Sequence, residues 1–319
     1  MHTTDQIQGS PPTNISGHDI VIIGGGPAGL TAAIYAARDK LSVLVVEKSI
    51  IGGLITETER VDNYPGFSEG ISGYDIADKM HKQAQLYGAR DVSGDVTAIT
   101  QTDDGFLVRT ADASYHARAV IVAGGSSHVK LGVPGEKEYT GRGVSYCATC
   151  DAPFFADKVV AIAGGGNTAM SEALHLTKFA QRVYIIHRRE EFRATPIVME
   201  AVTRNNKIEF IPDTVIEAVE GDDFVRKLRL RHVLSGDSSG LTINGLFVAI
   251  GLKPNTDYLK GLLELDAGGA IVVNDGMTTS VPGIFAAGDI RRHSVRQTVA
   301  AAGDGAVAAL TAKKWLEDL

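Results

Sequence analysis

Cysteine is scarce in this sequence: the 319-residue chain contains only two, Cys147 and Cys150, and they belong to one Cys-x-x-Cys motif. A single pair excludes the disulfide framework of a small secreted protein. We therefore expect the chain to work in a reducing, cytoplasmic environment.

Long apolar stretches and an excess of positive charge are also missing. No apolar run approaches the roughly 20 residues that cross a bilayer, and residues 1–17 are polar, without the basic start and apolar core of a signal peptide. We expect residues 1–17 to form a disordered leader and expect no membrane partner. The formal net charge of −7 argues against nucleic-acid binding, which needs clustered Lys and Arg.

Two classes of enzyme lack their signatures. The nine histidines show no metal-binding spacing, so no metal is predicted. A Gly-x-Ser-x-Gly element is absent, and hydrolysis by an activated serine therefore has no support.

Glycine, in contrast, is abundant, with 36 residues, and many of them mark two similar turns. The apolar run 19–23 leads into Gly24–Gly29, then an alanine-rich helical segment 30–37 and a strand 42–46 that ends at Glu47. This order is the strand, turn, helix and strand of a dinucleotide-binding unit. The pattern returns at 159–163, Gly164–Ala169, a helix to about Phe179 and a strand 183–186.

The length suits two such nucleotide-sized domains, and the chain crosses between them twice. Segments 105–110 and 114–122 read as antiparallel strands of the first domain. Breaks follow at Gly124-Gly125-Ser126 and, after the apolar run 245–250, at Gly251–Pro254. We predict an α/β fold of two Rossmann-like domains, one inserted into the other: residues 18–125 and 252–319 form the first, and residues 126–251 form the second. A small-residue helix from about Thr298 to Trp315 completes the first domain.

The residues that follow the second strand of each copy differ in charge. Glu47 can accept hydrogen bonds from ribose hydroxyls and would repel a 2′-phosphate, which favours FAD or NAD in the first copy. The second copy has His187-Arg188-Arg189 with Arg193 a turn later, and arginine matches phosphate geometry. We therefore interpret this basic stretch as a site for the 2′-phosphate of NADPH. The alternative interpretation is a solvated run of charges that binds no ligand.

Cys147-Ala148-Thr149-Cys150 precedes Asp151, just before the second nucleotide fold. Two cysteines at this spacing can form an easily exchanged disulfide, and Asp151 could move a proton. A structural zinc site would need two more ligands, for which no second pair exists. Two buried, unreactive cysteines are the other alternative. Beside two nucleotide sites, redox chemistry is favoured: hydride donor, flavin, disulfide and then an external acceptor.

Five segments in order make the sequence resemble the low-molecular-weight thioredoxin reductases over almost its whole length from His18. The motifs that carry the resemblance are Gly24–Gly29, Gly141–Asp151, Gly164–Ala169, His187–Arg189 with Phe192–Ala194, and Gly288-Asp289 with Arg296-Gln297.

The resemblance implies site residues of three kinds. Cys150 would exchange electrons with the flavin, while Cys147 would attack the thioredoxin disulfide with Asp151 as its acid-base partner. The residues implied for FAD are Gly24, Gly26, Pro27, Ala28, Gly29, Glu47, Lys48, Gly53, Leu54, Asn63, Val96, Ala123, Gly124, Gly288, Asp289, Arg296 and Gln297. Those implied for NADPH are Gly164, Gly166, Asn167, Thr168, Ala169, His187, Arg188, Arg189 and Arg193. The resemblance also implies a homodimer and alternation between two domain orientations about the hinge.

Two positions depart from the family pattern. Leu54 stands where many relatives carry Gln near the flavin, and it removes a polar contact. Gly124 replaces the usual Thr of an Ala-Thr-Gly turn, which we expect to loosen a turn beside the hinge.

Alternative functions remain within and beyond this fold. A relative that takes electrons from ferredoxin would lack the NADPH motif, and one that passes electrons to ferredoxin would lack the Cys-x-x-Cys. A peroxidase-linked relative usually carries an N-terminal thioredoxin-like extension. A glutaredoxin-like protein could replace thioredoxin as acceptor. A nucleotide-sensing module without turnover is the alternative from another class.

Overall fold

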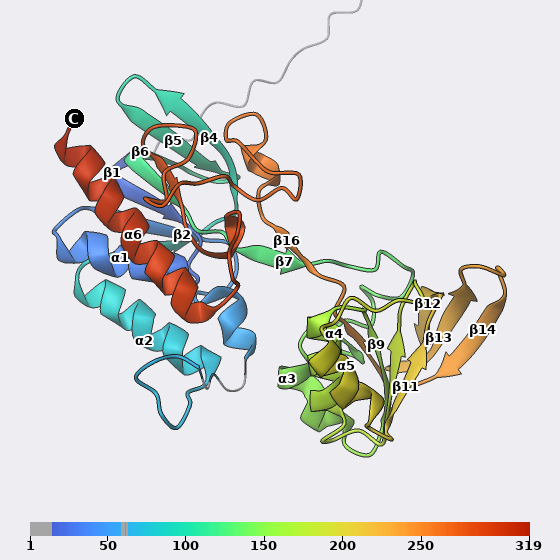
Figure 1. Cartoon of the computed structure of the whole chain (residues 1–319). Helices are drawn as coiled ribbons and strands as arrows, with labels where there is room; N and C mark the ends of the chain where they lie inside the picture. Colours follow the sequence, from blue (N-terminus) through green and yellow to red (C-terminus); the bar gives the residue numbers. More distant parts are fainter. Residues whose placement is uncertain (1–14, 59–60, 62) are drawn as a thin grey trace, which may run out of the picture. The chain divides into compact units, whose positions relative to one another are not determined.

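The computed structural model describes residues 15–58, 61 and 63–319, with only the backbone for Ile15, Ser16, Thr149 and Cys150. These residues divide into two compact units. The first unit comprises the described residues up to Thr56, residues 61 and 63–126, and Pro254–Leu319. The inserted unit comprises Ser127–Lys253 together with the residues just after Thr56. The second unit is therefore an insertion within the first, as predicted (Figure 1).

A mostly parallel sheet forms the centre of the first unit. Its strand order is β3-β2-β1-β6-β5-β4, and β17 also pairs with β6. The start of β6 pairs antiparallel with β5, whereas its last three residues pair parallel with β17. The strands are β1 (Ile15–Ile23), β2 (Val43–Glu47), β3 (Arg90–Ser93), β4 (Val96–Thr102), β5 (Gly105–Thr110), β6 (Ser114–Val122) and β17 (Ile284–Ala286).

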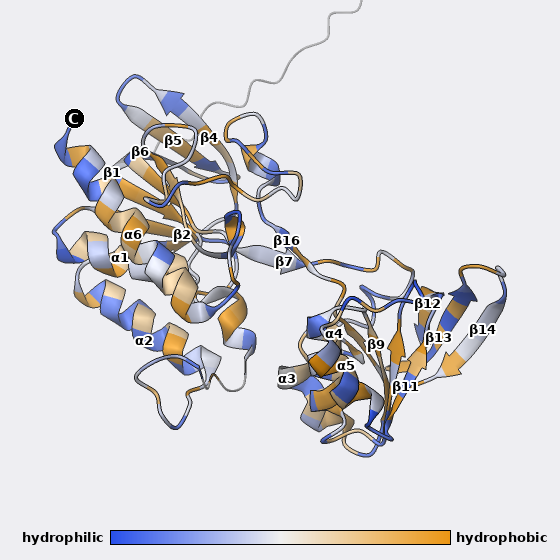
Figure 2. Ribbon diagram, in the orientation of Figure 1, coloured by the Kyte–Doolittle hydropathy of each residue, from blue (hydrophilic) through white to orange (hydrophobic). Residues whose placement is uncertain are grey.

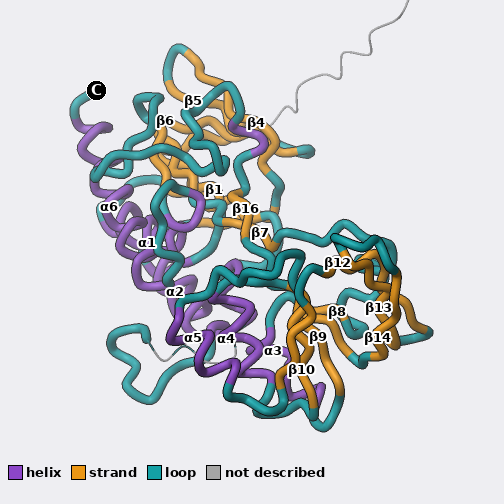
Figure 3. Tube along the Cα trace, turned by 45° about the vertical axis from the view of Figure 1, so that its right-hand side comes forward, coloured by secondary structure: helices purple, strands orange, loops and turns teal. Residues whose placement is uncertain are grey.

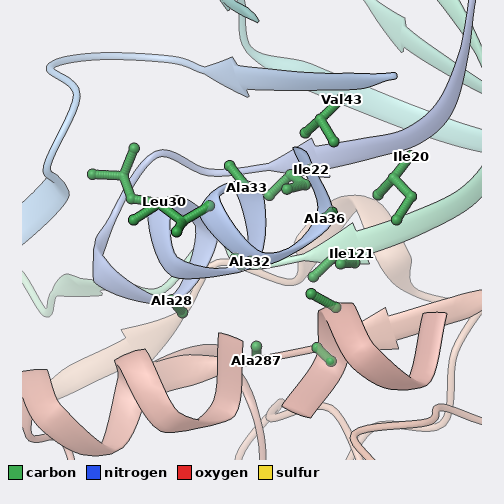
Figure 4. Close-up of a cluster of buried hydrophobic side chains, with 14 of the residues drawn as sticks. Ile20, Ile22, Ala28, Leu30, Ala32, Ala33, Ala36, Val43, Ile121 and Ala287 are labelled. Atoms are coloured by element: carbon green, nitrogen blue, oxygen red, sulfur yellow. The ribbon is translucent and has the colours of Figure 1, made fainter. Parts of the chain in front are cut away.

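Side chains alternate along these strands, so each face of the sheet contributes to a separate core. Ile20 and Ile22 pack with the helices, while Val21 and Ile23 pack with β4, β5 and the segment after β16 (Leu252–Pro254). Figure 4 shows the helix-side cluster around α1, and in Figure 2 the central strands are correspondingly orange. The helices are α1 (Pro27–Arg38), α2 (Gly73–Leu86) and α6 (Thr298–Glu317), with short 3₁₀ turns η1 (Gly53–Glu57), η3 (Asp257–Leu259) and η4 (Gly288–Ile290).

The inserted unit is also built on a sheet with a separate core on each face. Its parallel sheet has the order β11-β10-β9-β15-β8, and a separate antiparallel sheet has the order β12-β13-β14 (Figure 3). One face of the parallel sheet packs with α4 and α5, and the other packs with β12 and β13. The elements are β8 (Val144–Ser145), α3 (Ala148–Asp151), η2 (Ala152–Phe155), β9 (Val159–Ala163), α4 (Asn167–Leu176), β10 (Arg182–Ile186), α5 (Pro196–Thr203), β11 (Ile208–Ile211), β12 (Thr214–Gly221), β13 (Val225–His232), β14 (Ser238–Thr242) and β15 (Gly245–Val248).

The two connections between the units pair with each other as a two-stranded sheet. They are β7 (Ser126–His128) and β16 (Leu252–Pro254), which coincide with the two breaks in the sequence pattern. The units part after Ser126 and after Lys253, one or two residues later than the predicted boundaries.

The prediction of a leader over residues 1–17 is wrong at its last three residues. Ile15, Ser16 and Gly17 extend β1, pairing with Ser114, Tyr115 and His116 of β6. The short polar stretch has no strand pattern of its own, but the long β6 strand supplies hydrogen-bond partners that the local sequence cannot reveal. The rest of the predicted leader lies outside the described residues.

Gly29 sets how closely α1 approaches the glycine turn. A Cβ atom at this position would lie 1.9 Å from the Gly24 carbonyl oxygen and 3.0 Å from its carbon. We expect Gly29→Ala to destabilise the protein by about 3 kcal/mol, because a helix and a backbone turn must separate.

Thermal unfolding of Gly29→Ala beside Gly303→Ala checks this expectation. Gly303 lies in α6, and a Cβ atom there would meet nothing within 4 Å, so alanine should be neutral or stabilising by about 0.5–1 kcal/mol. Equal unfolding midpoints for the two variants would contradict the packing argument.

Candidate functional site

In the first unit the residues implied for FAD gather where parallel strands end. Gly24 follows β1, Glu47 ends β2, Ala123 follows β6 and Gly288 lies just after β17. The carboxyl ends of parallel strands share one edge of a sheet, which is where α/β proteins bind ligands. Residues far apart in the sequence therefore meet along one edge.

Within the first glycine turn, Gly26 occupies a position where the backbone and its surroundings would also accept a side chain. Its φ is −76°, and the nearest atom to a Cβ there would be the Gly52 carbonyl oxygen at 3.8 Å. Gly26 also caps α1 without any side-chain hydrogen bond, and Pro27 follows it. The space beside the bare Gly26 Cα is thus open at the N-terminus of α1, where the first N–H groups lack intrahelical partners and can bind the pyrophosphate of a dinucleotide.

The carboxylate of Glu47 is oriented by the same turn. One oxygen accepts a hydrogen bond from the Gly25 N–H at 2.7 Å, and the other accepts from the Ser49 N–H at 2.8 Å. A carboxylate oxygen can accept more than one hydrogen bond, so Glu47 still has capacity for ribose hydroxyls. Lys48, beside it, is exposed.

Two residues implied for FAD are joined directly although 234 positions separate them. The Asn63 side-chain amide donates to the Gln297 side-chain oxygen at 2.9 Å. Nearby, Ser294 donates its hydroxyl to Asp289 at 2.8 Å, and Arg296 adopts a positive φ of 55°. The segment between η4 and α6 is thus held in a defined turn rather than left as a free loop.

A buried ion pair that sequence reasoning missed fixes η4. Asp304 of α6 is 7% exposed and accepts hydrogen bonds from Arg291 Nε at 2.6 Å, Arg291 Nη2 at 2.8 Å and the Gly288 N–H at 3.1 Å. A lone acid on the alanine and glycine face of α6 was the available signal, because such residues are rarely buried unpaired.

The remaining residues implied for FAD occupy different surroundings. Gly53 and Leu54 begin η1, while Val96 is buried in the core. The turn at Gly124 is tied rather than loose, because Asn255 donates its side-chain amide to the Gly124 carbonyl at 2.8 Å. A Cβ at Gly124 would lie 3.5 Å from the Ile290 side chain, which is an ordinary van der Waals distance. The fold therefore has room for a Cβ at this position.

In the inserted unit, Gly166 repeats the situation of Gly26. It caps α4 with φ −105° and no side-chain hydrogen bond, and a Cβ there would meet nothing within 4 Å. Gly164 lies in the turn after β9, and Asn167, Thr168 and Ala169 form the first turn of α4. The Asn167 side chain accepts from the Thr195 N–H at 2.7 Å, which ties the turn to the segment beyond the basic motif.

The basic motif follows β10, the neighbour of β9. The His187 ring is buried, packs on Phe192 at 5.2 Å between centroids and lies against Gly165. Burial lowers the pKa of His187, and the charges of Arg193, Arg188 and Arg189 lower it further. Of the described residues, none forms an ion pair with these three exposed arginines. Three free guanidinium groups can therefore receive a phosphate.

The Cys-x-x-Cys lies at the carboxyl end of the edge strand β8, on the same sheet as the second glycine turn. Cys147 is disulfide-bonded. Its backbone N–H donates to the Ser145 hydroxyl at 3.1 Å, and its carbonyl accepts from the Asp151 N–H at 3.2 Å. Cys150 and Asp151 lie in α3, which packs on α4.

Glu172 of α4 is a partly buried carboxylate that the sequence did not single out. Among the residues that the structure describes, nothing donates a hydrogen bond to it. Burial raises the pKa of Glu172 to about 7, while the charge of the nearby His128 lowers this pKa by a smaller amount.

A raised folded-state pKa means that stability present below about pH 4.5 is lost as the pH rises through about 7. We expect this loss to be on the order of 1–3 kcal/mol and to disappear in Glu172→Gln. Unfolding midpoints at pH 5 and pH 8 measure it, with the exposed Glu190→Gln as the matched control. A pH dependence that survives in Glu172→Gln would assign it to another group.

Neither a cluster that could hold a metal ion nor a helix that could span a membrane is found in the described part of the chain. No cluster of three or more His, Cys, Asp or Glu side chains there could hold a metal ion. Likewise, none of the helices in the described ranges combines the length and apolarity needed to span a membrane.

Comparisons with known proteins agree over nearly the whole chain. The model of the pyridine nucleotide-disulphide oxidoreductase family matches residues 18–305. The thioredoxin reductase of Mycolicibacterium smegmatis is 47% identical over 302 residues, which span 94% of this chain and 97% of that protein. The thioredoxin reductase of Peptoclostridium litorale is 45% identical over 308 residues, spanning 95% and 98%. The crystal structure of Lactococcus lactis thioredoxin reductase superposes with a TM-score of 0.83 at 40% identity, covering 95% of this chain and all of that one.

Proposed function

Because this chain belongs to the pyridine nucleotide-disulphide oxidoreductase family, we infer that it is an NADPH-dependent thioredoxin-disulfide reductase. One observation carries this conclusion. Two open glycine-capped helices, one beside a carboxylate and one beside three free arginines, accompany a disulfide-bonded Cys147. The protein is a flavoprotein that uses FAD and NADPH, and thioredoxin is its substrate.

The residues present fit both cofactors. The first unit offers the bare Gly26 Cα, the first N–H groups of α1 and Glu47 for FAD. The inserted unit offers Gly166, the start of α4 and the exposed arginines for NADPH. Bound FAD supplies the means to turn a two-electron hydride transfer from NADPH into reduction of a disulfide.

The protein's own part in the chemistry is thiol-disulfide exchange. Reduction of the Cys147–Cys150 pair takes two electrons and two protons. The Cys147 thiolate then attacks one sulfur of the thioredoxin disulfide and displaces the other as a thiolate. Cys150 attacks Cys147 in turn, which restores the enzyme disulfide and releases thioredoxin as a dithiol. Asp151, one residue beyond Cys150, moves the proton.

The assembly and the compartment form part of the same proposal. We propose a homodimer, supported by exposed apolar side chains on α6: Val299, Val307 and Leu310 are 43%, 37% and 49% exposed. The paucity of cysteine supports a cytoplasmic location. Light scattering of the purified protein measures the mass, and a monomer would contradict the dimer.

The test of function is NADPH oxidation by the purified flavoprotein with and without thioredoxin. Rapid oxidation that depends on thioredoxin supports the proposal. Flavin reduction by NADPH without transfer to thioredoxin would shift the assignment to another disulfide acceptor, such as a glutaredoxin-like protein. Absence of any NADPH oxidation would favour a nucleotide-sensing module.

A further inference from the structure

Glu136 is a buried carboxylate that no step of the proposed reaction uses and that bonds to the residue before the redox pair. It is 4% exposed and accepts three hydrogen bonds: from the Leu131 N–H at 2.8 Å, the Gly132 N–H at 2.7 Å and the Tyr146 hydroxyl at 2.8 Å. A buried carboxylate with three donors is satisfied and held in one position.

Tyr146 is the partner that links Glu136 to the redox pair, because it directly precedes Cys147. Burial raises the pKa of Tyr146, and the hydrogen bond to Glu136 raises it further. The hydroxyl therefore stays protonated and remains a donor at neutral pH. The ring also packs against His128, with 5.7 Å between the ring centroids.

The Lys130 ammonium group contacts the face of the Tyr146 ring. The ammonium nitrogen lies 3.3 Å from the ring centroid, in the geometry of a cation–π contact. Partial burial lowers the pKa of Lys130, and the carboxylates of Glu136 and Glu57 oppose that shift. The tyrosine ring is thus held at its face by a cation and at its hydroxyl by an anion.

The segment that supplies these contacts follows β7 directly, at residues 130–136. It holds Tyr146 on the amino side of the redox pair, while the Ser145 hydroxyl and the Asp151 N–H bond to the backbone of Cys147. The peptide that carries Cys147 is therefore fixed on both sides.

We propose that Lys130, Tyr146 and Glu136 form a positioning clamp that keeps Cys147 placed for disulfide formation with Cys150. The clamp acts through the backbone of Tyr146, so its members are positioning residues. Two thiols held in place form a disulfide more favourably than two on a loose turn, because less conformational entropy is lost. Loss of the clamp favours the dithiol and raises the reduction potential of the pair.

This inference rests on the proposed redox function, and a thiol-disulfide equilibrium tests it without a turnover assay. The holoenzyme is equilibrated with mixtures of reduced and oxidised glutathione, and the free thiols are alkylated and counted by mass spectrometry. The reaction balances: the enzyme dithiol and oxidised glutathione give the enzyme disulfide and two reduced glutathiones.

Tyr146→Phe keeps the ring and removes the hydrogen bond to Glu136. We expect it to lower the equilibrium constant for the disulfide about tenfold, which corresponds to about 30 mV. Tyr139→Phe is the matched control, since Tyr139 is a buried tyrosine of the same unit with Arg142 over its ring at 5.7 Å. An unchanged equilibrium in Tyr146→Phe would overturn the clamp.

Lys130 supplies a second variant that cannot fail by misfolding of the core, because its side chain is exposed. Lys130→Met should shift the equilibrium about threefold in the same direction, and Lys130→Arg should restore it. Equal equilibrium constants for Lys130→Met and Lys130→Arg would show that Lys130 is not part of the clamp. A wild-type pair that NADPH cannot reduce would instead contradict the proposed function, so the two failures are distinguishable.

Discussion

Replacing Cys147 by serine is expected to lower the reduction of thioredoxin by at least about 10³-fold while FAD stays bound. A serine hydroxyl is neither an effective nucleophile towards sulfur at neutral pH nor able to form a disulfide. The residues that fit FAD lie in the first unit, whereas Cys147 lies in the inserted unit, so cofactor binding should persist.

Two measurements on each variant separate chemistry from folding. NADPH oxidation with thioredoxin measures the complete path, and NADPH oxidation with ferricyanide, which takes electrons without a dithiol, serves as the internal control. We expect Cys147→Ser and Cys150→Ser to lose the first activity and keep the second. Thioredoxin turnover retained in either variant would refute the proposed electron path.

The second large effect is expected at the basic motif after β10. Changing Arg188 and Arg189 together to alanine should raise the KM for NADPH about 100-fold and change that for NADH by less than about threefold. Each charge-assisted hydrogen bond to a phosphate contributes about 1.5–3 kcal/mol, and NADH lacks the 2′-phosphate that would receive it. Both arginines are exposed, so the substitutions should leave the core intact.

Steady-state kinetics with both nucleotides check this prediction. Arg204→Ala is the matched control, because it removes an exposed arginine of the same unit that pairs with Glu200 instead of a ligand. The control also measures the effect of losing one positive charge from this unit, half of what the double variant loses. Equal increases in the KM for NADPH and for NADH in the double variant would show that these arginines do not bind the 2′-phosphate.

The buried pair of Asp304 and Arg291 illustrates what the sequence could not predict about the site. Both residues are visible as charges, but only the packing of α6 against η4 shows that they meet. The same holds for Asn63 and Gln297, and for Tyr146 and Glu136. Side-chain partners in distant segments depend on the fold, and no local pattern encodes them.

The sequence by itself determined the fold class, the insertion and the position of the two glycine turns, while the nucleotide chosen by each turn stays a prediction. These features are local: a short apolar strand, glycines at fixed offsets, a helix and one acidic or basic strand end all lie within a few tens of residues. The strands 105–110 and 114–122 were predicted with the bounds that the structure has, because a polar turn separates two clear apolar patterns.

The tertiary structure alone decided the extension of β1 to Ile15, the antiparallel layer β12-β13-β14 and the contacts that hold η4 and Tyr146. Each depends on hydrogen bonds or packing between segments that the chain brings together only after folding. Strand pairing in particular is set by the available neighbour, since every residue except proline offers the same backbone N–H and C=O groups.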